Sequence, residues 1–189
     1  MTIGVILGST RPERFGEKPA QWLMDLTKKF PEATFTLIDL AEQNLPFLDE
    51  AIIPAYGNYQ NSHTKKWAEL IAGLDGFVVI TSEYNHSIPA ALKNAFDYLL
   101  SEWSYKPVGF IGYGADAGGQ RAVEQLRGMC GFLNMFDLSE HVTITRSWEA
   151  VDEQGNFAPT ADHQRAAQAM LEKLIFWAKH FKQARKELA

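Results

Sequence analysis

The chain has 189 residues, and 18 Lys and Arg side chains against 23 Asp and Glu give it a formal net charge of −5. Its hydrophobic fraction of 46% and charged fraction of 22% are those of an ordinary globular protein, which excludes an intrinsically disordered chain. The acidic balance argues against a nucleic-acid-binding protein, which needs a basic face for the phosphates.

The length is that of one domain, so we expect residues 1–189 to fold as a single unit. Cys130 is the only cysteine, which excludes an intrachain disulfide and a cysteine-based metal site and favours a reducing, cytoplasmic location. The five histidines show no paired metal-ligand spacing, so no metal is expected. The start lacks the basic residues of a signal peptide, and no apolar run is long enough to span a membrane.

Apolar runs rich in β-branched residues alternate with helix-spaced apolar stripes. The runs are apolar at consecutive positions, as in strands buried on both faces. They cover Ile3–Leu7, Thr34–Leu40, Phe77–Thr81, Val108–Ile111 and Val142–Thr145. The helical stripes lie within residues 20–30, 67–74, 88–99, 122–130 and 167–181. The alternation predicts an α/β fold with a doubly wound five-stranded parallel sheet of order 2-1-3-4-5 and helices on both faces.

Three segments that follow strands are candidates for a ligand site, because ligands bind beyond the carboxyl ends of such strands, between strands one and three. The first is Gly8–Gly16, where hydroxyls, Arg11 and Arg14 come to the start of a helix that would favour a phosphate dianion. It lacks the Lys-Ser/Thr ending of a P-loop, so nucleoside triphosphate hydrolysis is not expected. The alternative is an ordinary polar loop with a helix cap.

The second segment, Thr81–Pro89, joins the third strand to a helix. Ser87 suits a helix cap and Pro89 suits the first turn, but residues 83–85 are left without a structural role. Such a turn offers backbone donors and an aromatic face to a flat heterocycle. We interpret His86 as a loop or cap residue rather than a catalytic base.

The third segment, Gly112–Gly119, follows the fourth strand. Its first six residues fit the G-x-G-x-x-A dinucleotide fingerprint, so a pyridine-nucleotide dehydrogenase is an alternative. The match lies on the fourth βα unit instead of the first. A backbone that closely approaches a planar ligand would need the same glycines.

These segments resemble the NADPH-dependent FMN reductase family. Gly-Ser-Thr-Arg-Pro at 8–12, with Arg14 and Gly16, looks like its phosphate loop, and Glu-Tyr-Asn-His-Ser-Ile-Pro-Ala-Ala-Leu-Lys-Asn-Ala at 83–95 looks like its isoalloxazine-binding segment. Further matches lie at 45–47, 102–107 and 118–123, so the resemblance covers most of the chain up to about Arg127. It implies a flavodoxin-like fold that binds FMN noncovalently.

Carried over by position, the resemblance implies an FMN-binding set. The phosphate would be surrounded by Ser9, Arg11, Arg14, Phe15 and Gly16. The ribityl chain and ring would be lined by Ser82, Glu83, Tyr84, Asn85, His86 and Ser87, and the ring would be closed over by Gly112, Tyr113, Gly114 and Ala115. Ser82 stands where the family has Pro, and Gly112–Ala115 stands where it has Ser-Tyr-Gly-Gly. Both departures touch the surroundings of the ring and not the phosphate.

The implied function is an oxidoreductase that takes hydride from NAD(P)H and passes reducing equivalents through FMN to FMN, quinones, azo dyes or chromate. The chemistry belongs to the cofactor, so no side chain is nominated as catalytic. The partner is a small-molecule acceptor, with neither nucleic acid nor membrane expected. The alternatives are a flavodoxin-type electron carrier and a flavin-bound sensor, neither with its own NAD(P)H activity.

A homodimer or tetramer is also expected, with sites beside the interface. The irregular stretch Glu42–Asn61 carries more apolar surface than a solvated loop normally shows, at Phe47, Ile52, Ile53, Tyr56 and Tyr59. The third of the predicted long helices should keep apolar surface after its inner stripe is buried, at Phe96, Tyr98, Leu99 and Leu100. The alternative is that these aromatics fold back onto their own domain.

Overall fold

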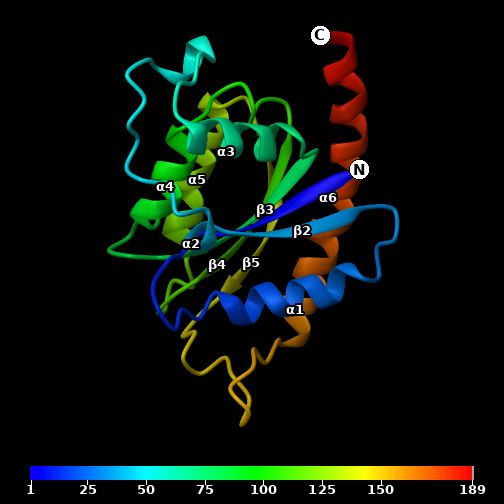
Figure 1. The fold of residues 1–189 in the computed structure, drawn as a ribbon. Helices are drawn as coiled ribbons and strands as arrows, with labels where there is room; N and C mark the ends of the chain where they lie inside the picture. Colours follow the sequence, from blue (N-terminus) through cyan, green and yellow to red (C-terminus); the bar gives the residue numbers. More distant parts are fainter. Residues whose placement is uncertain (189) are drawn as a thin grey trace.

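The computed structural model describes residues 1–188, and its strands form one parallel sheet with helices on both faces (Figure 1). The order across the sheet is β2-β1-β3-β4-β5, and every neighbouring pair is parallel. The strands are β1 (Thr2–Leu7), β2 (Thr34–Asp39), β3 (Gly76–Ser82), β4 (Pro107–Tyr113) and β5 (Phe136–Ile144). This confirms the predicted doubly wound fold and its strand order.

The helices divide between the two faces of the sheet (Figure 1). One face carries α1 (Glu17–Thr27) and α6 (Ala161–Leu188). The other carries α3 (Ser62–Ala72), α4 (Ala90–Asp97) and α5 (Gln120–Phe132). The irregular stretch between β2 and α3 holds two short elements, α2 (Leu40–Gln43) and the 3₁₀ turn η1 (Pro54–Tyr56).

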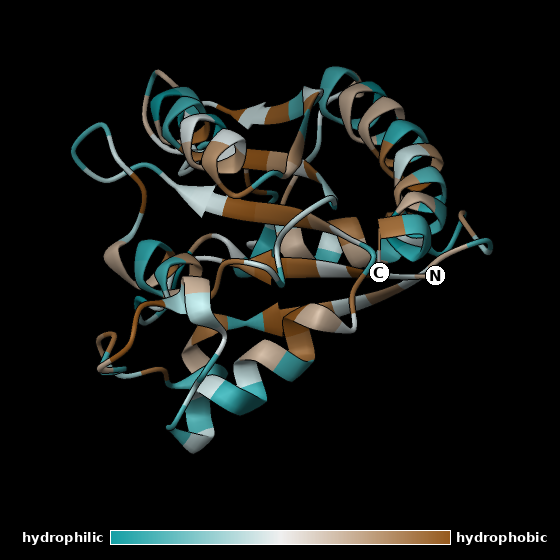
Figure 2. Ribbon diagram, turned by 90° about the horizontal axis from the view of Figure 1, so that it is seen from above, coloured by the Kyte–Doolittle hydropathy of each residue, from teal (hydrophilic) through white to brown (hydrophobic). Residues whose placement is uncertain are grey.

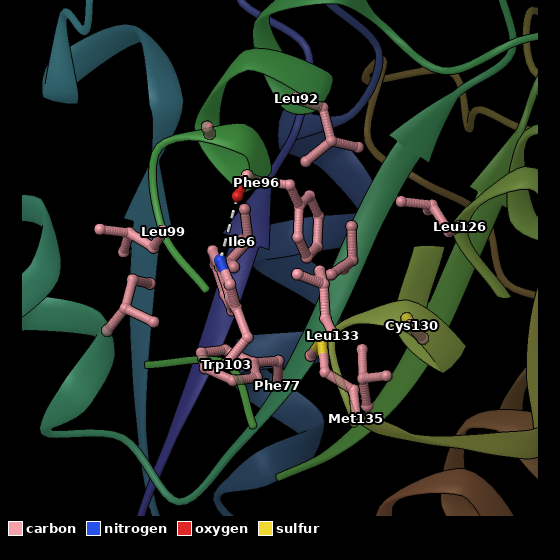
Figure 3. Close-up of a cluster of buried hydrophobic side chains, with 14 of the residues drawn as sticks. Ile6, Phe77, Leu92, Phe96, Leu99, Trp103, Leu126, Cys130, Leu133 and Met135 are labelled. Atoms are coloured by element: carbon pink, nitrogen blue, oxygen red, sulfur yellow. Dashed lines mark hydrogen bonds between the residues drawn. The ribbon is translucent and has the colours of Figure 1, made fainter. Parts of the chain in front are cut away.

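The central strands supply both hydrophobic cores. All residues of β3 and β4 are buried, so their alternate side chains pack into opposite helix layers, and in Figure 2 the strands are mostly brown. Phe77 packs into the layer of α3, α4 and α5, while Val78 packs against α1 and α6. In the first layer the Trp103 indole donates to the carbonyl of Phe96 at 3.2 Å, which satisfies its buried N–H (Figure 3).

The two edge strands depart from the prediction of strands buried on both faces. Both lie at an edge of the sheet, and only Ile38 of β2 and Leu138, Val142 and Ile144 of β5 are buried. β5 begins at Phe136, whereas the apolar run predicted a start at Val142. Asp137, Ser139 and Glu140 interrupt the apolar sequence there, and the pairing with β4 shifts register between Val108 and Phe110.

At the opposite end of the sheet from the candidate site, Lys106 is a buried cation. Its Nζ donates to the carbonyls of Ile71 (2.7 Å) and Ala72 (3.2 Å), where α3 ends. Burial lowers the pKa of Lys106 to about 8, although Asp75 and Glu102 oppose the shift. The Lys106 side chain therefore caps the C-terminus of α3, and its burial disfavours the charged form of the amine.

Candidate functional site

The three sequence-predicted segments meet at the carboxyl edge of the sheet, where β1 and β3 lie side by side. The Ser9 Oγ and the Tyr84 hydroxyl are 2.8 Å apart, which joins the first segment to the second. The Glu83 N–H donates to the Tyr113 carbonyl at 3.1 Å, which joins the second to the third. Between the segments lies a cavity of about 360 Å³, a volume suited to a small ligand.

The first segment, residues 8–16, presents unpaired backbone donors. Within the described residues 1–188, the N–H groups of residues 13–16 donate to no protein acceptor. They stand directly before α1, whose N-terminus favours an anion. Gly16 is required here because a Cβ would lie 2.7 Å from the Tyr113 hydroxyl and 2.8 Å from the Leu7 side chain.

The two arginines of this segment have different surroundings. The Arg14 guanidinium is almost fully buried, pairs with Asp39 and Glu17, and donates to the Ser9 carbonyl at 2.6 Å. Its charge is therefore already neutralised by protein groups. Arg11 is exposed at the rim of the cavity, and in the described part of the chain its guanidinium has no hydrogen-bond or ion-pair partner. Arg11 is the cation free to meet a ligand phosphate.

The second segment forms a tight two-residue turn. Tyr84 and Ser87 exchange backbone hydrogen bonds of 2.9 Å, and the residues between them, Asn85 and His86, have φ angles of 50° and 66°. Positive φ at both central positions is the type I′ turn, for which Asn is well suited. The N–H groups of Asn85 and His86 meet no protein acceptor anywhere in residues 1–188, so both are available to a ligand.

Helix α5 supports this turn from behind. The Glu83 carboxylate accepts from the Arg121 N–H at 3.1 Å and pairs with the Arg121 guanidinium at 2.7 Å. The Ser87 hydroxyl donates to Gln125 at 2.7 Å, and the Gln125 amide donates to the His86 carbonyl at 3.1 Å. The expectation that Ser87 caps the next helix is therefore wrong, because its hydroxyl is used by α5 and Pro89 is the N-cap of α4.

The third segment owes its glycines to packing. Gly118 and Gly119 have positive φ angles, and a Cβ on Gly119 would lie 2.4 Å from the Tyr113 nitrogen. A Cβ on Gly112 would lie 3.0 Å from the carbonyl oxygens of both glycines. The first turn of α5 is also already occupied by the Glu83 carboxylate. These contacts argue against a pyrophosphate at the dinucleotide-like sequence.

Two hydroxyls in the cavity wall lack partners. The Ser82 Oγ and the Tyr113 hydroxyl are buried without a hydrogen-bond partner in the described residues. Burial raises the pKa of Tyr113, so the phenol stays protonated at neutral pH. Both oxygens are shielded, and Ser82 and Ser9 lie near the Tyr113 hydroxyl, so the three hydroxyls form a polar cluster behind the cavity wall.

The predicted residues divide into those that line the cavity and those that shape it. Nine predicted site residues lie in its wall: Arg11, Arg14, Phe15, Ser82, Glu83, Tyr84, Tyr113, Gly114 and Ala115. Six lie behind or beside it: Ser9, Gly16, Asn85, His86, Ser87 and Gly112. Ser9 is fully buried, with its oxygen engaged by Tyr84. Glu13, Ser147 and Trp148 also line the cavity and were missed by the sequence analysis.

The donors available in and around the cavity fit a phosphorylated, planar ligand such as FMN. The free guanidinium of Arg11 and the N–H groups of residues 13–16 suit a phosphate. The free N–H groups of the turn and the aromatic side chains of the wall suit a polyol chain and a flat ring with acceptor atoms. Among residues 1–188 there is no cluster of His, Cys, Asp or Glu that could hold a metal ion. No helix among these residues is long and apolar enough to cross a membrane.

Comparison with known proteins identifies the family. The sequence profile described as NADPH-dependent FMN reductase matches residues 1–149. An NAD(P)H-dependent FMN reductase of Schizosaccharomyces pombe is 41% identical over 133 residues, which are 69% of this chain and 66% of the relative. The match thus spans slightly less than two thirds of that relative's length. A 2-hydroxy-1,4-benzoquinone reductase of a Burkholderia species is 27% identical over 190 residues, covering 95% of this chain and 97% of the relative.

Solved structures share the fold. FerB, a flavoenzyme NAD(P)H:(acceptor) oxidoreductase from Paracoccus denitrificans, superimposes with a TM-score of 0.75 at 22% identity. The superposition covers 95% of this chain and 98% of that structure. A flavodoxin from Pseudomonas aeruginosa gives a TM-score of 0.57 at 17% identity, covering 95% of this chain and 99% of that structure. The flavodoxin-like architecture expected from the sequence is thereby confirmed.

Proposed function

The chain belongs to the NADPH-dependent FMN reductase family, and from this premise we propose that it is an FMN-dependent NAD(P)H oxidoreductase that reduces FMN, quinones or similar small acceptors. The observation that carries the proposal is the set of unpaired donors at the carboxyl edge of β1 and β3. The active unit is the single domain of residues 1–189. Azo dyes and chromate are further acceptors of the same class.

Each part of the cavity then has a role in holding the cofactor. Arg11 and the N–H groups of residues 13–16 bind the phosphate, while Arg14 positions the loop through Ser9 and Asp39. Ser82 lies in the wall, and the N–H groups of Asn85 and His86 donate to the polyol and the ring edge. When bound, FMN transfers two electrons so that NAD(P)H, a proton and a quinone become NAD(P)⁺ and a hydroquinone.

Phe15, Tyr84 and Tyr113 give the otherwise polar wall an aromatic part that can lie against the ring. The Phe15 and Tyr113 rings pack in a tilted contact with 5.2 Å between their centroids, and Tyr84 is held in place by its hydrogen bond to Ser9. No side chain in the wall has to donate or remove a proton, since the acceptor takes protons from solvent. The protein therefore acts by position and by fixed N–H and O–H dipoles.

Steady-state oxidation of NADPH tests the proposal against the electron-carrier alternative. The purified protein, loaded with FMN, should oxidise NADPH or NADH continuously with 1,4-benzoquinone as acceptor and no added reductase. An electron carrier or a sensor would bind FMN equally well but would consume no NAD(P)H. Gel filtration of the loaded protein shows whether FMN travels with the chain as a cofactor or leaves as a substrate.

We also propose a homodimer, with a tetramer as its extension. An apolar groove of about 950 Å³ runs between η1, α4 and α5, beside the turn that holds Ser87. Ile53 on one wall is 62% exposed and Phe132 on the other is 79% exposed. Gly128 on the same face of α5 has no neighbour within 4 Å of an added Cβ, which leaves that helix open to close approach. A second copy would bury these groups and shield the adjacent turn from water.

Several side chains that were expected at the interface are instead buried in their own domain. Phe96, Tyr98 and Leu99 are at most 2% exposed, so the expectation that they keep free apolar surface is wrong. Leu100, the fourth residue of that expectation, is partly exposed and lines the groove. The Tyr98 hydroxyl reaches back to the carbonyl of Pro46 at 3.0 Å and anchors the irregular stretch to its own domain. Tyr59 also folds back, with its hydroxyl on Glu102 at 3.0 Å.

A cytoplasmic location is part of the proposal and is tested by cell fractionation.

A further inference from the structure

The turn after β5, residues Arg146–Glu149, is fixed to the third segment of the site. The Gly114 N–H donates to Ile144, the Arg146 N–H to Ala115, and the Ser147 N–H back to Gly114, at 3.0 to 3.2 Å. The turn is closed by the Glu149 N–H on the Arg146 carbonyl at 2.7 Å and by an ion pair of 3.0 Å between the two side chains. In Figure 1 it begins the yellow-to-orange loop below the sheet.

Backbone hydrogen bonds of the neighbouring residues therefore hold the turn that carries Trp148. The side chain lines the cavity but is 59% exposed. Each of the other four tryptophans packs against another aromatic ring, whereas Trp148 has no aromatic partner within residues 1–188. A large apolar ring held open at the mouth of a cavity exposes a face to whatever enters.

We propose that Trp148 is a specificity-determining residue that stacks on planar, conjugated ring acceptors such as quinones as they enter the site. The indole supplies an electron-rich face and quinones are electron-poor rings, so an offset stack is favourable. A small neutral quinone has little besides its ring to bind with. NADPH also carries phosphates and ribose hydroxyls, so it depends less on any one ring contact. The inference rests on the proposed function and specifies its acceptor class.

The test compares acceptors that differ in shape. W148A, W148F and, as a control on an exposed aromatic of α6, F176A are loaded with FMN. For each, kcat and KM are measured with 1,4-benzoquinone and with ferricyanide, which offers no planar ring. The dissociation constant of 1,4-hydroquinone from the oxidised protein is read from the flavin absorbance, independently of turnover. Circular dichroism and FMN affinity confirm that each variant is folded and loaded.

W148A should lower kcat/KM for benzoquinone about three- to tenfold, mainly through KM. It should weaken hydroquinone binding by a smaller factor, because that electron-rich ring keeps only the surface contact with the indole. W148F should stay within about twofold of wild type, as should F176A and every variant with ferricyanide. Equal losses with both acceptors, no loss at all, or a loss confined to the reaction with NADPH would overturn the inference. Wild-type protein that fails to oxidise NADPH would instead overturn the proposed function itself.

Discussion

Replacing Arg11 with Ala should weaken FMN binding and leave the fold intact. The Arg11 side chain is exposed at the cavity rim, and within the described chain its guanidinium contacts no protein acceptor. Truncation therefore removes a cation from the rim without opening a cavity or orphaning a buried group. The free energy of unfolding should change by no more than about 0.5 kcal/mol.

The loss of affinity follows from one charge-assisted hydrogen bond. Such a bond is worth about 1.5–3 kcal/mol, which corresponds to a rise in Kd of roughly 10- to 150-fold. Because the rim is open to solvent, we expect the lower end of this range, about tenfold, and a smaller effect at high salt. Riboflavin lacks the phosphate, so its affinity should be the same in R11A and wild type.

Quenching of flavin fluorescence at fixed ionic strength measures both constants. Arg14→Ala is the matched control, because that guanidinium is buried and paired with Asp39 and Glu17. It should cost about 3–5 kcal/mol of stability, seen in urea unfolding. An unchanged Kd for FMN in R11A, or an equal loss for FMN and riboflavin, would show that residues 8–16 do not hold the phosphate.

Three further substitutions test other parts of the structure. Asn85→Leu should shift the flavin absorbance or potential, while Asn85→Gly, which keeps the positive φ, should shift it less; a Leu variant with wild-type spectrum, potential and turnover contradicts the assigned turn. Lys106 has a folded pKa of about 8 against an ordinary 10.5, so between these values the unfolded chain holds the proton that the folded chain has lost, and stability rises with pH by up to about 3 kcal/mol. Urea unfolding measured across this pH range should show the rise in stability for wild type and not for Lys106→Met. An equal rise in both proteins would show that Lys106 is not its source. Phe132→Glu places a charge in the apolar groove and should yield monomers in light scattering; a wild-type mass near 21.3 kDa with full activity rejects the dimer.

The sequence predicts the centre of the fold better than its edges. β1, β3 and β4 are continuous apolar runs, and hydrophobic pattern is a direct consequence of burial on both faces. β5 is an edge strand, and the first half of it carries polar residues that face solvent. The hydrophobic pattern therefore does not reveal this half as a strand, and the predicted start at Val142 is too late. The strand order was chosen because five βα units in a short chain suit the smaller doubly wound fold, and the sequence alone does not prove it.

The candidate site shows the same division. The meeting of the three segments could be predicted, because each follows a strand and parallel strands end at one edge of the sheet. The separate roles of Arg11 and Arg14 could not, since Asp39, the less exposed of the two carboxylates that pair with Arg14, lies 25 positions away. Trp148 was missed for a similar reason. It follows β5, whose carboxyl end meets the same edge, so its position in the chain was the one available signal.

The visible spectrum of the purified protein, recorded before and after anaerobic addition of NADPH, tests the central claim most directly. The account predicts a yellow protein, or one that becomes yellow when FMN is added, whose flavin band bleaches with NADPH and returns when benzoquinone is admitted. A protein that binds no FMN, or that binds FMN and keeps the oxidised band in the presence of excess NADPH and NADH, would contradict it.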